Sequence, residues 1–217
     1  MMIKEMRSQF DLLAENIRAE CGRGAIYYFP NPGNWGDALI RYGTLKFFED
    51  YNLSYREIKT GFNPSDMQRS KKEWVHRFVE NGTVIYGGGG GWCQIFNHAE
   101  GHVKAHQVRL KYGGFQLQFK TIVMPSTYEK KYSIPDTIFF RRDVFESQQH
   151  MPDAIFCHDL AFYAAPPQSL TLESGRGAGY FFRNDVGSSG KIKSNCSTRG
   201  KKGAINRESL LNRLISS

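Results

Sequence analysis

The sequence predicts an α/β protein built on a doubly wound parallel sheet. Short runs of β-branched and aromatic residues alternate with longer amphipathic segments as far as residue 163, which is the pattern of consecutive βαβ units. Two of the short runs end in glycine-rich turns, at the place where sheets of this class hold their ligands. With 217 residues, the chain is long enough for one domain with a sizeable core, or for that domain and the start of a second.

The individual elements follow from the spacing of the apolar residues. The first helix is expected to end at the glycine of "CGRG", and its apolar stripe consists of Ile3, Met6, Phe10, Leu13 and Ile17. Strands, the last of which overruns into a loop, are predicted over residues 24–30, 53–60, 83–91, 120–126, 136–142 and 154–164. The other helices are predicted over residues 37–51, 65–81, 97–112 and 143–149. About six strands suit a Rossmann-like domain, and Gly43 marks a point of close packing in the second helix.

The carboxyl-terminal part of the chain has a different composition. Pro166 and Pro167 precede a polar stretch, so residues 166–178 are interpreted as a linker that follows a domain formed by residues 1–165. The run "GYFFRND" predicts a strand that begins a second domain, but the residues after it are rich in Gly, Ser and Lys. We therefore expect residues 179–217 to hold the start of a truncated second domain and a basic, disordered tail.

The positive charge of the chain is concentrated in this tail. The formal net charge is +8, but residues 183–217 contain eight Lys and Arg side chains against two acidic ones, which leaves +2 for the rest. A basic tail suggests nucleic acid as a partner. That hypothesis predicts salt-dependent binding that is lost when residues 186–217 are deleted. No zinc-finger spacing or RNA-binding aromatic signature accompanies the charge, so no specific nucleic acid is expected.

Cysteine usage and hydropathy favour a cytoplasmic protein without a transmembrane segment. The four cysteines form no CxxC pair and are irregularly spaced, which favours reduced thiols over disulfides. No apolar run approaches the roughly 20 residues that a membrane span needs. The amino-terminal stretch has the pattern of an amphipathic helix instead of a signal peptide.

Three histidines share one face of a predicted helix. His98, His102 and His106 are spaced four residues apart, and such a spacing can bind a metal ion. Gly101 weakens the helix between them, so no metal is expected. A contact of His98 or His102 with a substrate is the alternative function of this segment.

Two glycine-rich turns are the most informative motifs. "NPGNWGDA" follows a predicted strand and opens a helix, and "GGGGGW" follows another strand as a mobile or closely approached loop. Glycine lets a ligand approach the backbone, and a helix N-terminus offers free N–H groups to anions. Neither turn has the GxGxxG or GxxxxGK[ST] pattern of nucleotide-binding loops. Asp37 is placed either to cap the helix or to present a carboxylate to a sugar hydroxyl.

These motifs together resemble the polysaccharide pyruvyl transferase family. The resemblance lies in "GNWGDALIRYGTLKFF", "VIYGGGGGW", "FFRRDVFES" and "CHDLAFY", in that order, and covers residues 24–185. It implies two facing Rossmann-like domains, similar to GT-B glycosyltransferases, of which this chain holds the amino-terminal half. Members of the family transfer pyruvate from phosphoenolpyruvate, the donor substrate, onto two sugar hydroxyls as a ketal without a separate cofactor. The implied acceptor is a sugar or a lipid-linked oligosaccharide of exopolysaccharide or cell-surface glycan synthesis.

The resemblance also implies roles for individual residues. Asp37 is the candidate general base, or at least an orienter of the acceptor. The two turns are expected to contact substrate through Gly33, Asn34, Trp35, Gly36, Gly88, Gly89 and Gly90. Arg183 is the candidate for the anionic groups of the donor, because a guanidinium offers them a planar fork. The alternative for Arg183 is an exposed surface position.

Three more candidates follow predicted strand ends. Arg142 is expected to bind the acceptor or to hold a loop through Asp143, with a pair of charges at a helix start as the alternative. His158 and Asp159 complete the expected substrate-binding set. His158 departs from the glycine that the family usually has before this Asp, and a hydrogen-bonded structural histidine is its alternative role.

Other functions remain open beside an active transferase. A single Rossmann-like domain suits a catalytically inactive remnant that binds a sugar or a partner, because the donor-binding half of the family is replaced by the basic tail. A glycosyltransferase that uses a nucleotide sugar would need the same second domain. A partner chain is the alternative source of the missing half, and a homo-oligomer is a further possible assembly.

Overall fold

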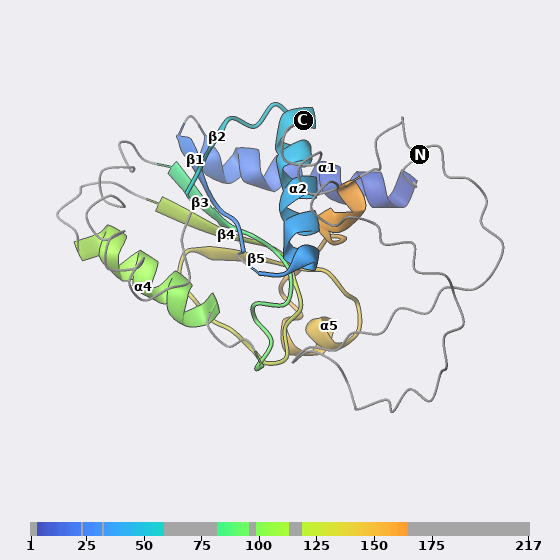
Figure 1. Cartoon of the computed structure of the whole chain (residues 1–217). Coiled ribbons are helices and arrows are strands. Elements are labelled where there is room, and N and C mark those ends of the chain that lie inside the picture. Colours follow the sequence, from blue (N-terminus) through green and yellow to red (C-terminus); the bar gives the residue numbers. More distant parts are fainter. Residues whose placement is uncertain are drawn as a thin grey trace, which may run out of the picture. The chain divides into compact units, whose positions relative to one another are not determined.

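The computed structural model of the chain describes residues 4–22, 24–31, 33–58, 82–95, 99–112 and 119–164. These residues form a six-stranded sheet in the order β2-β1-β3-β4-β5-β6 (Figure 1). The strands are β1 (Ala25–Phe29), β2 (Tyr55–Glu57), β3 (Gly82–Tyr86), β4 (Phe119–Ser126), β5 (Thr137–Arg141) and β6 (Ile155–Phe156). Every neighbouring pair is parallel, so the predicted parallel sheet is confirmed.

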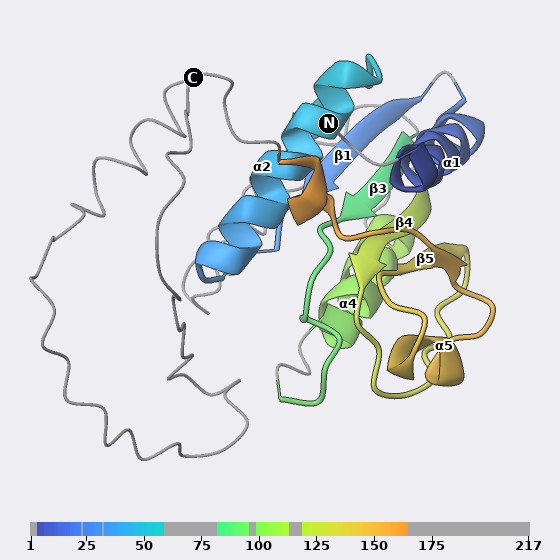
Figure 2. The same ribbon diagram turned by 90° about the vertical axis from the view of Figure 1, so that its right-hand side faces the viewer.

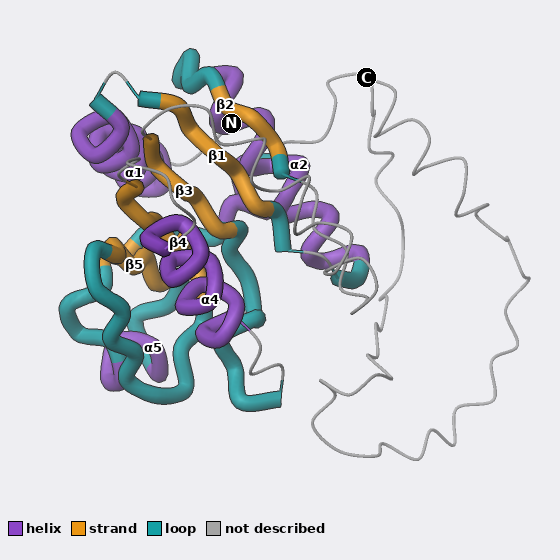
Figure 3. Tube along the Cα trace, turned by 90° about the vertical axis from the view of Figure 1, so that its left-hand side faces the viewer, coloured by secondary structure: helices purple, strands orange, loops and turns teal. Residues whose placement is uncertain are grey.

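Helices cover both faces of the sheet, as Figures 1 and 3 show. They are α1 (Lys4–Cys21), α2 (Trp35–Asp50), α4 (Ala99–Tyr112), the short α5 (Glu146–His150) and a 3-10 helix, η1 (Leu160–Tyr163). Alternate residues of β4 point to opposite layers, because Ile122 packs in the same cluster as α1 and α2, whereas Val123 packs with α4. Strands that are buried on both faces read as continuous apolar runs, which is why they were visible in the sequence.

Helix α1 packs as its spacing predicts. Phe10, Leu13 and Ile17 are fully buried in the cluster that lies between α1, α2 and the sheet. The helix ends at Cys21, immediately before the predicted glycine stop at Gly22.

Helix α2 meets η1 at Gly43, which is the close packing predicted for this residue. A Cβ atom at Gly43 would lie 1.8 Å from the carbonyl oxygen of Leu160. The hydroxyl of Tyr163 also donates a hydrogen bond of 2.8 Å to Asp50 near the end of α2. The 3-10 helix is therefore held against α2 along most of its length (Figure 1).

The last predicted strand is much shorter than expected. Only Ile155 and Phe156 pair with β5, and the apolar run continues as η1. The reason is local: the side chain of Asp159 accepts a hydrogen bond from the backbone of Ala161 and begins a helical turn. Three predictions lie outside the described residues, namely the helix over 65–81, the linker over 166–178 and the second domain with its tail over 179–217.

Within the described ranges, no helix is both long and apolar enough to cross a membrane. Cys93 and Cys157 are free thiols.

Candidate functional site

The strand order places the two glycine turns side by side. From β1 the chain moves to β2 on one side, and β3 then pairs on the other side of β1. Such a reversal leaves a gap between the connections at the carboxyl ends of the two central strands, and this is where doubly wound proteins bind ligands. Figure 2 shows the chain leaving β1 and β3 at the same edge of the sheet. The first glycine turn follows β1, and the second follows β3.

The first turn is organised by a capping box at the start of α2. Asn34 is the N-cap, and its side-chain oxygen accepts a hydrogen bond of 2.8 Å from the backbone of Gly36. The carboxylate of Asp37 reaches back, and its Oδ2 accepts a hydrogen bond of 3.0 Å from the backbone of Asn34. The helix therefore begins two residues earlier than predicted. Asp37 is the third helical residue of the box, and the expectation that it is itself the N-cap is wrong.

The two turns meet at the carboxylate of Asp37. A Cβ atom at Gly33 would lie 1.9 Å from Oδ2, so glycine is needed for the carboxylate to fold back onto the turn. A Cβ atom at Gly89 would lie 3.3 Å from Oδ1. Within the described part of the chain, Oδ1 accepts no hydrogen bond. One oxygen of Asp37 is thus fixed by the turn, and the other lies beside the second turn.

The second turn extends the sheet beyond β3. Gly87 donates its N–H to Phe29 at 2.7 Å, Gly89 donates to Pro125 at 3.1 Å, and Thr127 donates to the carbonyl of Gly89 at 3.1 Å. Other atoms approach this loop closely. The approaching atoms belong to the protein, because a Cβ at Gly88 would lie 2.4 Å from the carbonyl oxygen of Pro125. Gly90 accepts a hydrogen bond from the backbone of Cys93.

Asn31 joins the two turns and was not among the predicted site residues. Its side-chain nitrogen lies 3.4 Å from the carbonyl oxygen of Gly88. The same nitrogen would lie 3.1 Å from a Cβ atom at Gly91. A signal was present in the sequence, because Asn31 stands between the end of a strand and the first glycine turn, where side chains face the carboxyl edge of the sheet.

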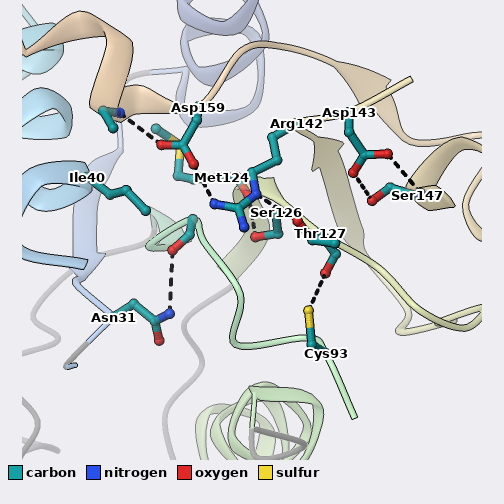
Figure 4. A network of polar contacts seen from close by, with 12 residues as sticks. Asn31, Ile40, Cys93, Met124, Ser126, Thr127, Arg142, Asp143, Ser147 and Asp159 are labelled. Atoms are coloured by element: carbon teal, nitrogen blue, oxygen red, sulfur yellow. Dashed lines mark hydrogen bonds and ion pairs between the residues drawn. The ribbon is translucent and has the colours of Figure 1, made fainter. Parts of the chain in front are cut away.

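Arg142 and Asp159 form an ion pair across the ends of β5 and β6 (Figure 4). The Nη1 atom of Arg142 lies 2.5 Å from Oδ2 of Asp159, and its Nε donates a hydrogen bond of 2.7 Å to the hydroxyl of Thr127. The side chains are 29% and 12% exposed, respectively. The predicted strand-end residues 142 and 159 are therefore in direct contact, although 16 residues separate them along the chain.

The expected contact between Arg142 and Asp143 is wrong. The carboxylate of Asp143 accepts hydrogen bonds from the backbones of Phe145 and Ser147 and from the hydroxyl of Ser147. It therefore organises the start of α5. Arg142 turns instead toward Asp159, whose second oxygen is held by the backbone of Ala161 at 2.8 Å.

Trp35 and His158 lie at the same edge of the sheet. The indole of Trp35, the first residue of α2, is 54% exposed. The ring of His158 packs edge-on against Phe156 and Phe162, with centroid distances of 5.2 and 6.0 Å. In the described residues it makes no hydrogen bond.

Of the three predicted histidines, His102 and His106 lie in α4. His98 is outside the described residues. His106 is buried, and its Nδ1 lies 2.6 Å from the hydroxyl of Tyr86 at the end of β3. Burial raises the pKa of Tyr86 well above its usual range, so the phenol keeps its proton. His102 packs edge-on against His106 at 4.8 Å. In the described ranges, no group of three His, Cys, Asp or Glu side chains is arranged to hold a metal ion.

A pocket of about 410 Å³ lies at the other edge of the sheet. It is lined by the segments that lead into β5 and β6, including Lys131, Ile134, His150 and Met151. None of the predicted site residues lines it. We place the candidate site at the carboxyl edge, because the switch in strand order and the convergent polar side chains lie there.

Comparison with known proteins gives a fold relationship without a named activity. No protein-family model and no curated protein matches the chain. A solved structure of a functionally uncharacterised protein from Klebsiella pneumoniae is similar, with 25% sequence identity and a TM-score of 0.52. The match covers 79% of this chain and 62% of that one, so the chain spans less than two thirds of the length of the similar protein.

Proposed function

We propose that the chain is a ketal-forming pyruvyl transferase that moves pyruvate from phosphoenolpyruvate onto two hydroxyls of a sugar, in cytoplasmic synthesis of an exopolysaccharide or cell-surface glycan. The sequence resemblance suggests the reaction. Its four motifs span or directly follow the carboxyl ends of β1, β3, β5 and β6, on one edge of the sheet. The observation that carries the proposal is the carboxylate of Asp37, which has one oxygen fixed by Asn34 and the other beside Gly89.

The reaction needs a group that accepts a proton. The methylene carbon of phosphoenolpyruvate gains a proton as a sugar oxygen bonds to the adjacent carbon and loses its own proton. A second sugar oxygen then bonds to the same carbon, its proton leaves, and the bond to phosphate breaks. Asp37 is the proposed base for a sugar hydroxyl, because its free oxygen lies at the switch point where an acceptor would lie.

The remaining side chains at this edge have proposed binding roles. Arg142 keeps one guanidinium nitrogen, Nη2, without a hydrogen bond to the described part of the chain, and this nitrogen can bind a substrate oxygen. The exposed indole of Trp35 can cover the apolar face of a sugar ring. The assignment of Arg183 to the anionic groups of the donor lies outside the described residues and stays a prediction.

A non-catalytic domain that binds a sugar or a partner is the second candidate. One observation favours it: the capping box gives Gly33, Asn34 and Asp37 a structural reason to be present. The first turn would then look the same in a protein that turns over nothing.

Phosphate release from phosphoenolpyruvate, measured with galactose-, glucose- and mannose-containing acceptors, separates the two candidates. Asp37→Asn keeps an oxygen for the capping box but removes the base, and should lower acceptor-dependent release by at least about 100-fold. Asp136→Asn is the matched control, because it removes a carboxylate at the opposite edge of the sheet and leaves release unchanged. A folded wild-type protein that releases no phosphate with any acceptor would favour the binding domain.

A further inference from the structure

Arg142 is held from two sides, by elements that belong to different parts of the site. Figure 4 shows its guanidinium between Asp159, which begins η1, and Thr127, which follows β4. The backbone of Thr127 donates to the carbonyl of Gly89. The position of the guanidinium is therefore tied to the second glycine turn, beside which Asp37 lies.

Asp159 ties the same guanidinium to helix α2. One oxygen of its carboxylate accepts from Ala161, and the other accepts from Arg142. The 3-10 helix that it begins packs against Gly43 and is bonded through Tyr163 to Asp50. Because α2 carries Asp37 at its first turn, the guanidinium of Arg142 and the carboxylate of Asp37 are fixed to a common element.

We propose that Asp159 is a positioning residue. It does not bind substrate itself but fixes the Arg142 guanidinium so that Nη2 faces the substrate. This proposal rests on the proposed function for its effect on turnover. The geometry supports it because both oxygens of Asp159 already accept hydrogen bonds and its side chain is only 12% exposed. Each oxygen is thus already engaged by the protein, and the low exposure of the side chain leaves little of it accessible to a ligand.

Asp159→Asn separates the two contacts of this side chain. The amide oxygen of Asn can still accept from Ala161 and begin η1, since Asn is as good at this position as Asp. The amide nitrogen cannot accept a hydrogen bond from Arg142. Tyr163→Phe is the control, because it removes the bond between η1 and α2 without touching Arg142.

The first readout is the ¹H–¹⁵N resonance of the Arg142 Nη1–H group that donates to Asp159, assigned by its absence in Arg142→Lys. We expect slow exchange with water in the wild type and in Tyr163→Phe, and exchange faster by about tenfold or more in Asp159→Asn. This readout does not require any turnover. An unchanged exchange rate in a folded Asp159→Asn protein would overturn the proposal.

The second readout is the split between kcat and KM. With the guanidinium free to rotate, we expect kcat/KM to fall by about 10- to 100-fold, mainly through KM. Asp159→Glu, which can still accept from Arg142, should recover part of the loss. Faster exchange in a protein whose wild type is inactive would support the positioning of Arg142 and overturn the transferase proposal alone. A lower kcat/KM without faster exchange would show that Asp159 contacts substrate directly, against the proposal.

Discussion

In the first glycine turn the glycines make room for side chains, whereas in the second Gly87 and Gly88 make room for the backbone of neighbouring segments. Gly33 is exposed and lies against the carboxylate of Asp37, a flexible group. Gly87 and Gly88 are buried, and the atoms nearest to them belong to the main chain of Asn31 and Pro125. The comparison indicates that the second turn is part of the scaffold and that the first is the adaptable wall of the site.

The largest effect is expected for Gly88→Ala. Its new Cβ atom would lie 2.4 Å from the carbonyl oxygen of Pro125, and neither strand can move without breaking the sheet. Overpacking typically costs about 1–3 kcal/mol in the free energy of unfolding, and we expect a loss at the upper end of this range. Urea denaturation followed by circular dichroism measures it. A loss below about 1 kcal/mol would show that the second turn yields as easily as the first and would remove the contrast.

Gly33→Ala should affect activity more than stability. A Cβ atom at Gly33 would overlap Oδ2 of Asp37, but the carboxylate can rotate away at the expense of its bond to Asn34. We expect a loss of about 1–2 kcal/mol in unfolding free energy and a fall in phosphate release similar to that of Asp37→Asn. In the double variant Gly33→Ala/Asp37→Ala the two losses should not add, since both act on one contact. Additive losses would mean that Gly33 acts independently of Asp37.

The contrast between the turns also explains how much of the site the sequence could predict. The sheet, the order of its elements and the placement of four motifs at one edge follow from apolar runs that alternate with helical spacing. The predicted start of α2 is two residues too late because Asn34 and Asp37 both suit an N-cap. Their spacing of three residues is the signature of a capping box. The pairing of Arg142 with Asp159 could not be predicted, since it depends on the direction of two side chains at neighbouring strand ends. Asp143 was the expected partner of Arg142 because the two residues are adjacent in the sequence.

Asn34→Ala tests the capping box without touching a glycine. It removes the oxygen that accepts from Gly36 at 2.8 Å, while the backbone N–H that holds Asp37 remains. The expected cost is about 1 kcal/mol in unfolding free energy, and phosphate release should fall less than in Gly33→Ala. Thermal denaturation of Asn34→Ala beside Asn34→Ser, which keeps a capping oxygen, measures the cap alone. Equal stabilities for the two variants would show that the cap contributes nothing to α2.

Gly36→Ala should have the smallest effect, although it changes a glycine of the first turn. A Cβ atom there would lie 3.1 Å from the side-chain oxygen of Asn34, which can shift by a few tenths of an ångström. The second residue of a helix gains up to about 1 kcal/mol when Ala replaces Gly, so we expect a net change within about 0.5 kcal/mol. If stability is unchanged but phosphate release falls tenfold or more, the open space above Gly36 is occupied by substrate. Unchanged release would instead show that, of these residues, only Gly33 and Asp37 form the adaptable wall of the site.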